Sequence, residues 1–163
     1  MLILIIVLVV LALIVMSLYN GLVKNRVKVD NAWSDIAVYL KKRYDLIPNL
    51  VSTVKGYAAH ESQTLERVIA ARNQAINNGA NASVSDVAAS QAAISTGLRS
   101  IFALSENYPD LKANTNFIEL QNSLKDIESD LASSRRYYNA TVRDYNTSIQ
   151  TVPQVFLANA FGF

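Results

Sequence analysis

Two short patterns in the chain hold residue types that could do chemistry. Ser52 and Lys55 have the S-x-x-K spacing of a serine nucleophile and its lysine base, but the S-D-N and K-T-G elements that such acylases also need are absent. His60-Glu61 begins like the zinc motif H-E-x-x-H, yet Thr64 stands where the second histidine is required. His60 is the one histidine and cysteine is absent, so a single chain cannot build a histidine or thiolate zinc site. We therefore predict no catalytic residue, no cofactor and no metal.

A group of carboxylates in the last third of the chain is the other candidate for metal chemistry. Its members are Asp126, Glu128, Asp130 and Asp144. Asp126 and Asp130 lie four residues apart and share one helix face, but Lys125 and Arg135 surround them, which is typical of a solvated surface. A carboxylate metal site in a helical bundle needs ligands at core positions of facing helices. The predicted core positions contain no carboxylate, so we expect surface charges here.

Lys41, Lys42 and Arg43 form a basic cluster in the most positively charged part of the chain. Residues 24–60 hold seven Lys and Arg against three Asp, whereas residues 61–163 hold eight against ten acidic residues. Two interpretations fit this cluster equally well: a patch for a partner protein or neighbouring subunit, or a solvated helix face. The net charge of +2 gives no continuous basic stripe, so we do not expect nucleic-acid binding.

These residues follow an N-terminal segment, Met1 to Val23, that contains no charged side chain. A helix rising about 1.5 Å per residue over this length spans roughly 34 Å, which is enough to cross a hydrocarbon core of about 30 Å. No Lys or Arg precedes the apolar run, and the run exceeds the apolar core of about 7 to 15 residues found in signal peptides. We therefore predict a retained, single-pass transmembrane helix over residues 1–23.

The residues at the end of this segment suit a membrane interface. Tyr19 can place its ring at the level of the lipid headgroups, and Lys24, Arg26 and Lys28 can contact anionic headgroups. The positive-inside rule then predicts a cytoplasmic bundle and an external N-terminus. A bundle on the outer, periplasmic side is the alternative.

Beyond residue 23, apolar residues recur every three or four positions, which is the period of a helix. The pattern predicts helices over about 24–58, 62–77, 86–107 and 116–152. The stripe of the first helix consists of Val29, Trp33, Ile36, Leu40, Ile47, Leu50, Val54 and Tyr57, with Arg43 or Tyr44 bridging its middle. No residue between Val23 and Val29 breaks the helix, so we expect the membrane helix to continue into it. Pro48 either kinks this helix or lies in the first turn of a fresh helix capped by Asp45.

Turn and capping signals separate the later helices. The run 77–79, Asn-Asn-Gly, is expected to end the second helix, with the glycine in a left-handed conformation. Ser85 is a candidate N-cap for the third helix, and Pro109 ends that helix. Asn116 and Glu119 resemble a capping box for the last helix, in which a seven-residue repeat favours coiled-coil-like packing. The predicted fold is all-α: one transmembrane helix that continues into an antiparallel bundle over residues 24–153.

Two features favour contacts between copies of the chain. Ser17 and Gly21 form a small-xxx-small pair that can bring two membrane helices close together, although small residues are common in such helices. The last segment, residues 154–163, is an uncharged apolar tail that contains Phe156, Phe161 and Phe163. Because soluble monomers avoid exposing such a patch, this tail is expected to cover the bundle, meet another subunit or touch lipid.

Most of the chain resembles the LemA family. The resemblance lies in Tyr19 to Arg72, in Glu106 to Pro153 and in the closing FGF, with the specific runs KRYDLIPNLV, YPDLKA and YYNATVRDYN. It implies a bacterial protein with one N-terminal membrane helix and a bundle of long antiparallel helices. It also implies no established enzymatic activity, a chain that often continues somewhat beyond FGF, and genes that often lie near those of membrane metalloproteases.

The composition and the resemblance together lead to one expected function and one alternative. We expect a non-enzymatic, membrane-anchored helical bundle that self-associates as a homo-oligomer and acts as a scaffold at the bacterial cell (inner) membrane. Its expected partners are the lipid bilayer and further copies of itself. The alternative, implied by the resemblance alone, is an adaptor or regulator of a membrane protease or of a signalling partner.

Overall fold

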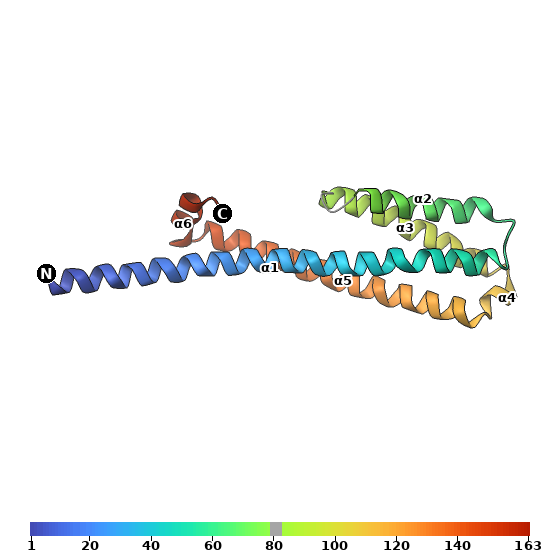
Figure 1. Ribbon diagram of the computed structural model, residues 1–163, viewed down its shortest axis with the longest axis horizontal. Helices are drawn as coiled ribbons and strands as arrows, with labels where there is room; N and C mark the ends of the chain where they lie inside the picture. The colour runs from blue at the N-terminus through green and yellow to red at the C-terminus, as the bar shows by residue number, and fades with distance from the viewer. Residues whose placement is uncertain (79–82) are drawn as a thin grey trace. The chain divides into compact units, whose positions relative to one another are not determined.

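The computed structural model describes residues 1–78 and 83–163, and within them all regular structure is helical. The helices of this described part are α1 (Leu2–Lys55), α2 (Ser62–Asn77), α3 (Val84–Ser105), α4 (Pro109–Lys112), α5 (Thr115–Gln150) and α6 (Gln154–Phe161) (Figure 1). The prediction of an all-α fold whose apolar N-terminal helix continues into a helical bundle is confirmed. The chain forms two compact units, Tyr39–Ser129 and Met1–Val38 with Asp130–Phe163, so that α1 and α5 each contribute to both.

The first helix is continuous from the apolar N-terminus to Lys55. It passes through Pro48, so the alternative of a fresh helix starting at Asp45 is wrong. Pro48 has no N–H to donate to the carbonyl of Tyr44, four residues earlier. That carbonyl instead accepts a hydrogen bond of 2.8 Å from the Nε of Arg72 on α2. A donor from a neighbouring helix thus replaces the one that proline removes.

The starts of α3 and α5 differ from the predicted ones because other polar residues cap these helices. The N-cap of α3 is Ser83 rather than Ser85: its hydroxyl accepts from the Asp86 N–H at 3.1 Å, and the Asp86 carboxylate accepts from the Ser83 N–H at 3.3 Å. At the start of α5, the side-chain oxygen of Asn114 accepts from the Phe117 N–H at 3.0 Å. The capping box predicted from Asn116 is therefore wrong, and the helix begins one residue earlier.

The helix ends also differ in detail. Lys55 ends α1, earlier than the predicted 58, so Tyr57 does not continue the buried stripe: it is exposed, and Ala58 is buried instead. Asn77 ends α2, and Gly79, predicted to terminate it, lies outside the described residues. The segment predicted as an apolar tail contains a helix, α6.

The core of the unit Tyr39–Ser129 is built from one apolar face of each helix. Its buried members are Ile47, Leu50, Val54, Ala58, Leu65, Val68, Ile94, Leu98, Ile101, Leu111, Phe117 and Leu124. The helices α2 and α3 approach closely at Gly97, where an added Cβ would lie 2.7 Å from a methyl group of Val68. Only glycine fits this contact without a shift of the Val68 side chain.

In the other unit, residues 19–36 of α1 pack with the second half of α5 and with α6. Leu22, Ala32 and Ile36 of α1 are buried, and the Trp33 and Tyr138 rings lie 5.3 Å apart. The stretch from residue 2 to 16 is exposed throughout. Of the described helices, α1 is the one long and apolar enough to cross a membrane.

Candidate functional site

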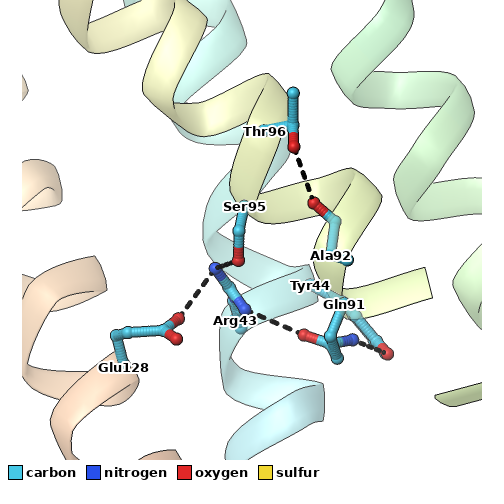
Figure 2. A network of polar contacts seen from close by, with 7 residues as sticks. All are labelled: Arg43, Tyr44, Gln91, Ala92, Ser95, Thr96 and Glu128. Atoms are coloured by element: carbon cyan, nitrogen blue, oxygen red, sulfur yellow. Dashed lines mark hydrogen bonds and ion pairs between the residues drawn. The ribbon is translucent and has the colours of Figure 1, made fainter. Parts of the chain in front are cut away.

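A buried arginine is the most unusual feature of the unit Tyr39–Ser129. The Arg43 side chain is only 4% exposed and lies between α1, α3 and α5 (Figure 2). Its Nη1 donates to the Gln91 side-chain oxygen at 2.9 Å, and its Nη2 donates to the Ser95 hydroxyl at 2.9 Å. The same Nη2 forms an ion pair of 2.8 Å with Glu128 on α5. The amide of Gln91 in turn donates to the Tyr44 hydroxyl at 2.6 Å.

The helical period explains why this charge points inward. Arg43 lies three residues after Leu40 and four before Ile47, both of which are buried, so its side chain must start on the core face. A buried charge is tolerated only where hydrogen bonds and an opposite charge replace its water. Gln91 and Ser95 are four residues apart on α3 and therefore present their polar groups on one face.

Residues 43 and 44 together connect the first helix to three others. Arg43 reaches α3 and α5, and Tyr44 reaches α3 through its hydroxyl and α2 through its carbonyl, which accepts from Arg72. We name Arg43, Tyr44, Arg72, Gln91, Ser95 and Glu128 the polar hub. Its hydrogen bonds and its ion pair join four helices, α1, α2, α3 and α5.

Features of the sequence indicate which residues of the polar hub need polar partners. Arg43 lies on the core stripe, and Arg72 shares the stripe of its own helix with Leu65 and Val68. The carbonyl freed by Pro48 needs a donor from outside the helix. These signals mark which residues need polar partners, but they do not say which distant residues supply them.

The structure separates the three residues of the predicted basic patch. Lys41 is exposed and lies 3.6 Å from the Asp45 carboxylate, and the exposed Lys42 ammonium lies 5.2 Å from the centre of the Tyr39 ring. Arg43 is in the core and cannot belong to a surface patch. A partner patch at Lys41 and Lys42 stays a prediction.

The candidate metal ligands of the sequence do not meet. Among the residues that the structure describes, no group of three or more His, Asp or Glu could hold a metal ion. Asp126, Asp130 and Asp144 are exposed, whereas Glu128 pairs with Arg43 and is not a simple surface charge. Ser52, Lys55 and His60 are exposed. The absence of catalytic, cofactor and metal sites stays a prediction.

Glu61, the neighbour of the single histidine, contacts the short helix α4 at its start. The Tyr108 hydroxyl, at the N-cap of α4, donates to the Glu61 carboxylate at 3.4 Å. Burial raises the pKa of the Tyr108 phenol, and the negative charge of Glu61 raises this pKa further. The phenol therefore keeps its proton and acts as a donor at neutral pH.

The predicted interface residues lie on exposed parts of α1. Lys24, Arg26 and Lys28 are exposed, as are Ser17 and Gly21. The contacts of Tyr19 were not foreseen: its ring lies edge-on to two phenylalanines of the C-terminal segment. The partners are Phe161, at a centroid distance of 5.1 Å, and Phe163, at 5.5 Å. Self-association through the small residues or the phenylalanines stays a prediction.

The fold and the polar hub define an all-α bundle that carries an apolar helix suited to a membrane. Comparison with known proteins is consistent with this class. The LemA family model matches residues 32–163, and the chain belongs to the LemA family.

Two curated relatives illustrate the extent of the similarity. The chain is 24% identical over 168 residues to the magnetosome protein MamQ of Magnetospirillum gryphiswaldense, covering 89% of this chain and 62% of that protein. It is 26% identical over 133 residues to the protein LemA of Metamycoplasma hominis, covering 81% of this chain and 59% of that one. The chain thus spans about three fifths of the length of these relatives. The family and the apolar helix together indicate a membrane-associated helical protein.

Proposed function

We propose that this protein is a non-enzymatic scaffold that self-associates at the bacterial cell membrane. The observation that supports this proposal is the single helix α1. Its first part is apolar, exposed and long enough to cross a bilayer, and its last turns supply Ile47, Leu50 and Val54 to the core of the unit Tyr39–Ser129. A membrane segment and a protein core are therefore parts of one secondary-structure element, with no linker between them.

The chemistry of the polar hub supports a structural role rather than catalysis. The guanidinium of Arg43 is enclosed, and its two terminal nitrogens bond to partners on α3 and α5. An active site needs a group that can reach substrate, and the most exposed residue of this hub, Glu128 with 48% of its side chain exposed, is already paired with Arg43. Buried polar networks of this kind fix the register of packed helices.

The proposed contact between copies is the exposed face of α1 that carries Ser17 and Gly21. Apart from Gly21, its two neighbours and the adjacent backbone of α1, no described atom lies within 4 Å of the position that a Cβ of Gly21 would take. A second helix can therefore approach this face to short distance, which is how small residues stabilise membrane helix pairs. This proposal uses the face of α1 and does not need the C-terminal phenylalanines.

The test is the mass of the full-length protein in lipid nanodiscs and in mild detergent. We expect an oligomer, and we expect Gly21→Leu to weaken association by about tenfold, equivalent to about 1.4 kcal/mol, because a large side chain separates the helices. The matched control is Ala12→Leu, which lies nine residues away, about 180° around the same helix. A wild-type protein that is strictly monomeric in lipid would refute self-association.

A further inference from the structure

The C-terminal helix α6 and the residues just before it expose large apolar side chains. No residue from Thr151 to Phe163 is charged. Val152, just before α6, is 74% exposed, and Phe156 on α6 is 69% exposed. The helix is held by its other face, where Ala158 is buried. Phe156 lies two residues before Ala158, about 160° away around the helix, so its ring points away from the protein.

The end of α6 is built to contact the first helix. Gly162 adopts the left-handed conformation, with φ 72°, and the Phe163 N–H donates to the Ala158 carbonyl at 3.0 Å. This turn folds Phe163 back, so that its ring and that of Phe161 both lie edge-on to Tyr19. Aromatic edge contacts of this kind fix orientation as well as adding apolar contact area.

The position of Tyr19 on α1 sets the level of this contact in a membrane. Tyr19 is 17 residues after Leu2, which is about 26 Å along a helix, and a hydrocarbon core is about 30 Å thick. The rings of Phe161 and Phe163 therefore lie near the boundary between hydrocarbon and headgroups. Lys24 follows about 7.5 Å further along, at headgroup level.

We propose that α6 is an interfacial helix, which rests on the lipid surface beside the point where α1 leaves the bilayer, with Val152 and Phe156 inserted among the lipids. We assign lipid as the occupant of its exposed face because the end of α6 contacts Tyr19, at the level where the apolar segment of α1 leaves the bilayer. Phenylalanine is typical of the apolar face that an interfacial helix buries at the boundary of the acyl chains. The protein would thus contact the membrane at both ends of its chain. This inference rests on membrane association and is independent of self-association.

The test uses the absence of native cysteine, which allows a single nitroxide label at each chosen position of the full chain. The label is attached at Phe156→Cys in protein reconstituted at one copy per nanodisc of phosphatidylcholine and phosphatidylglycerol. Collision rates with oxygen, which dissolves in lipid, and with a polar nickel chelate, which stays in water, report its surroundings. Leu8→Cys within the apolar segment is the lipid reference. Ser34→Cys, about 22 Å beyond Tyr19 along α1, is the water reference.

We expect the ratio of oxygen to nickel collisions at residue 156 to approach that at residue 8 and to exceed that at residue 34 several-fold. Asn159→Cys, on the same exposed face of α6, provides a second label position and should give an intermediate ratio. A ratio at residue 156 equal to that at residue 34 would mean that α6 is in water and would overturn the proposal. Low collision rates with both reagents at residue 156 would show that protein rather than lipid covers α6, and would overturn it equally. Because one copy per disc is measured, a failure of self-association does not affect this result.

Discussion

At the scale of the residue, the buried charge of Arg43 shows how a single position can specify a helix arrangement. A guanidinium offers a planar fork of donors, and here its two terminal nitrogens reach Gln91, Ser95 and Glu128 in different directions. Lysine carries the same charge but a single ammonium group, which cannot reach all these acceptors. An apolar side chain would leave the Gln91 amide oxygen without its donor in the core.

We therefore predict that Arg43→Lys lowers the free energy of unfolding by about 1–3 kcal/mol, because the change leaves buried acceptors unsatisfied. Thermal unfolding of the full chain in mild detergent, followed by circular dichroism, measures this loss. The control is Lys42→Met, an exposed neighbour that should change stability by less than about 0.5 kcal/mol. A stability of Arg43→Lys within that same range would show that the hub does not need the guanidinium.

A second prediction concerns the carbonyl that Pro48 frees. Arg72→Met should destabilise the protein by about 1 kcal/mol, because the Tyr44 carbonyl loses the donor from α2. In a Pro48→Ala background, residue 48 regains an N–H that can reach this carbonyl, so the same change should cost measurably less. The double-mutant cycle on unfolding free energies measures this coupling. Arg67→Met, an exposed arginine on α2, is the control, and equal losses in both backgrounds would contradict the prediction.

At the scale of the element, the sequence predicted the presence of the long helices more accurately than their first residues. The pattern at residues 62–77 coincides with α2 because apolar periodicity continues over its whole length. The N-cap of α3 was misplaced because two serines lie close together, and only Ser83 has an acidic residue three positions later, at Asp86. That S-x-x-D spacing is a local signal that distinguishes Ser83 from Ser85 as the N-cap.

The partners of the polar hub could not be predicted in the same way. Arg43 contacts residues 48 and 52 positions further along the chain, and such contacts depend on how helices pack rather than on local spacing. The periodicity favours a core position for Arg43, whereas the charges of its neighbours Lys41 and Lys42 favour a surface position, either a partner patch or a solvated face. Burial at one position of a helix says nothing of the adjacent positions, which face other directions.

The close contact of α2 and α3 at Gly97 determines how the protein should respond to a larger residue at this position. Replacing glycine by alanine inside a helix normally stabilises it by roughly 1 kcal/mol. Gly97→Ala should instead destabilise the protein by about 1 kcal/mol, because the new methyl group would overlap Val68 and overpacking outweighs the propensity gain. In a Val68→Ala background the same change should be stabilising, since the obstructing methyl is gone. Urea unfolding of the wild type, the two single variants and the double variant measures the change in unfolding free energy in each background. A stabilising Gly97→Ala in the wild-type background would contradict the expected overlap.

At the scale of the whole molecule, the apolar N-terminal segment and the apolar C-terminal segment, which both lack charged side chains, are in contact. The first 23 residues could be assigned to a membrane helix from composition alone, because length and absence of charge are sufficient signals. The contacts of Tyr19 with Phe161 and Phe163 join residues from the two ends of the chain, which composition cannot pair. The proposed role of α6 as an interfacial helix therefore depends on a contact that the structure shows and composition does not.

The orientation of the chain is the last prediction, and it follows from the charges beside α1. Lys24, Arg26 and Lys28 are exposed and follow the apolar segment directly, so the positive-inside rule predicts that residues after 28 are cytoplasmic. In spheroplasts, a membrane-impermeant maleimide should label Ser34→Cys only after permeabilisation and should label Leu2→Cys without it. Replacing the three basic residues by glutamine and adding three lysines after Met1 should reverse this pattern in a fraction of the molecules, because the charge bias is then inverted. Labelling of Ser34→Cys in intact spheroplasts of the unaltered protein would place the bundle on the outer side instead.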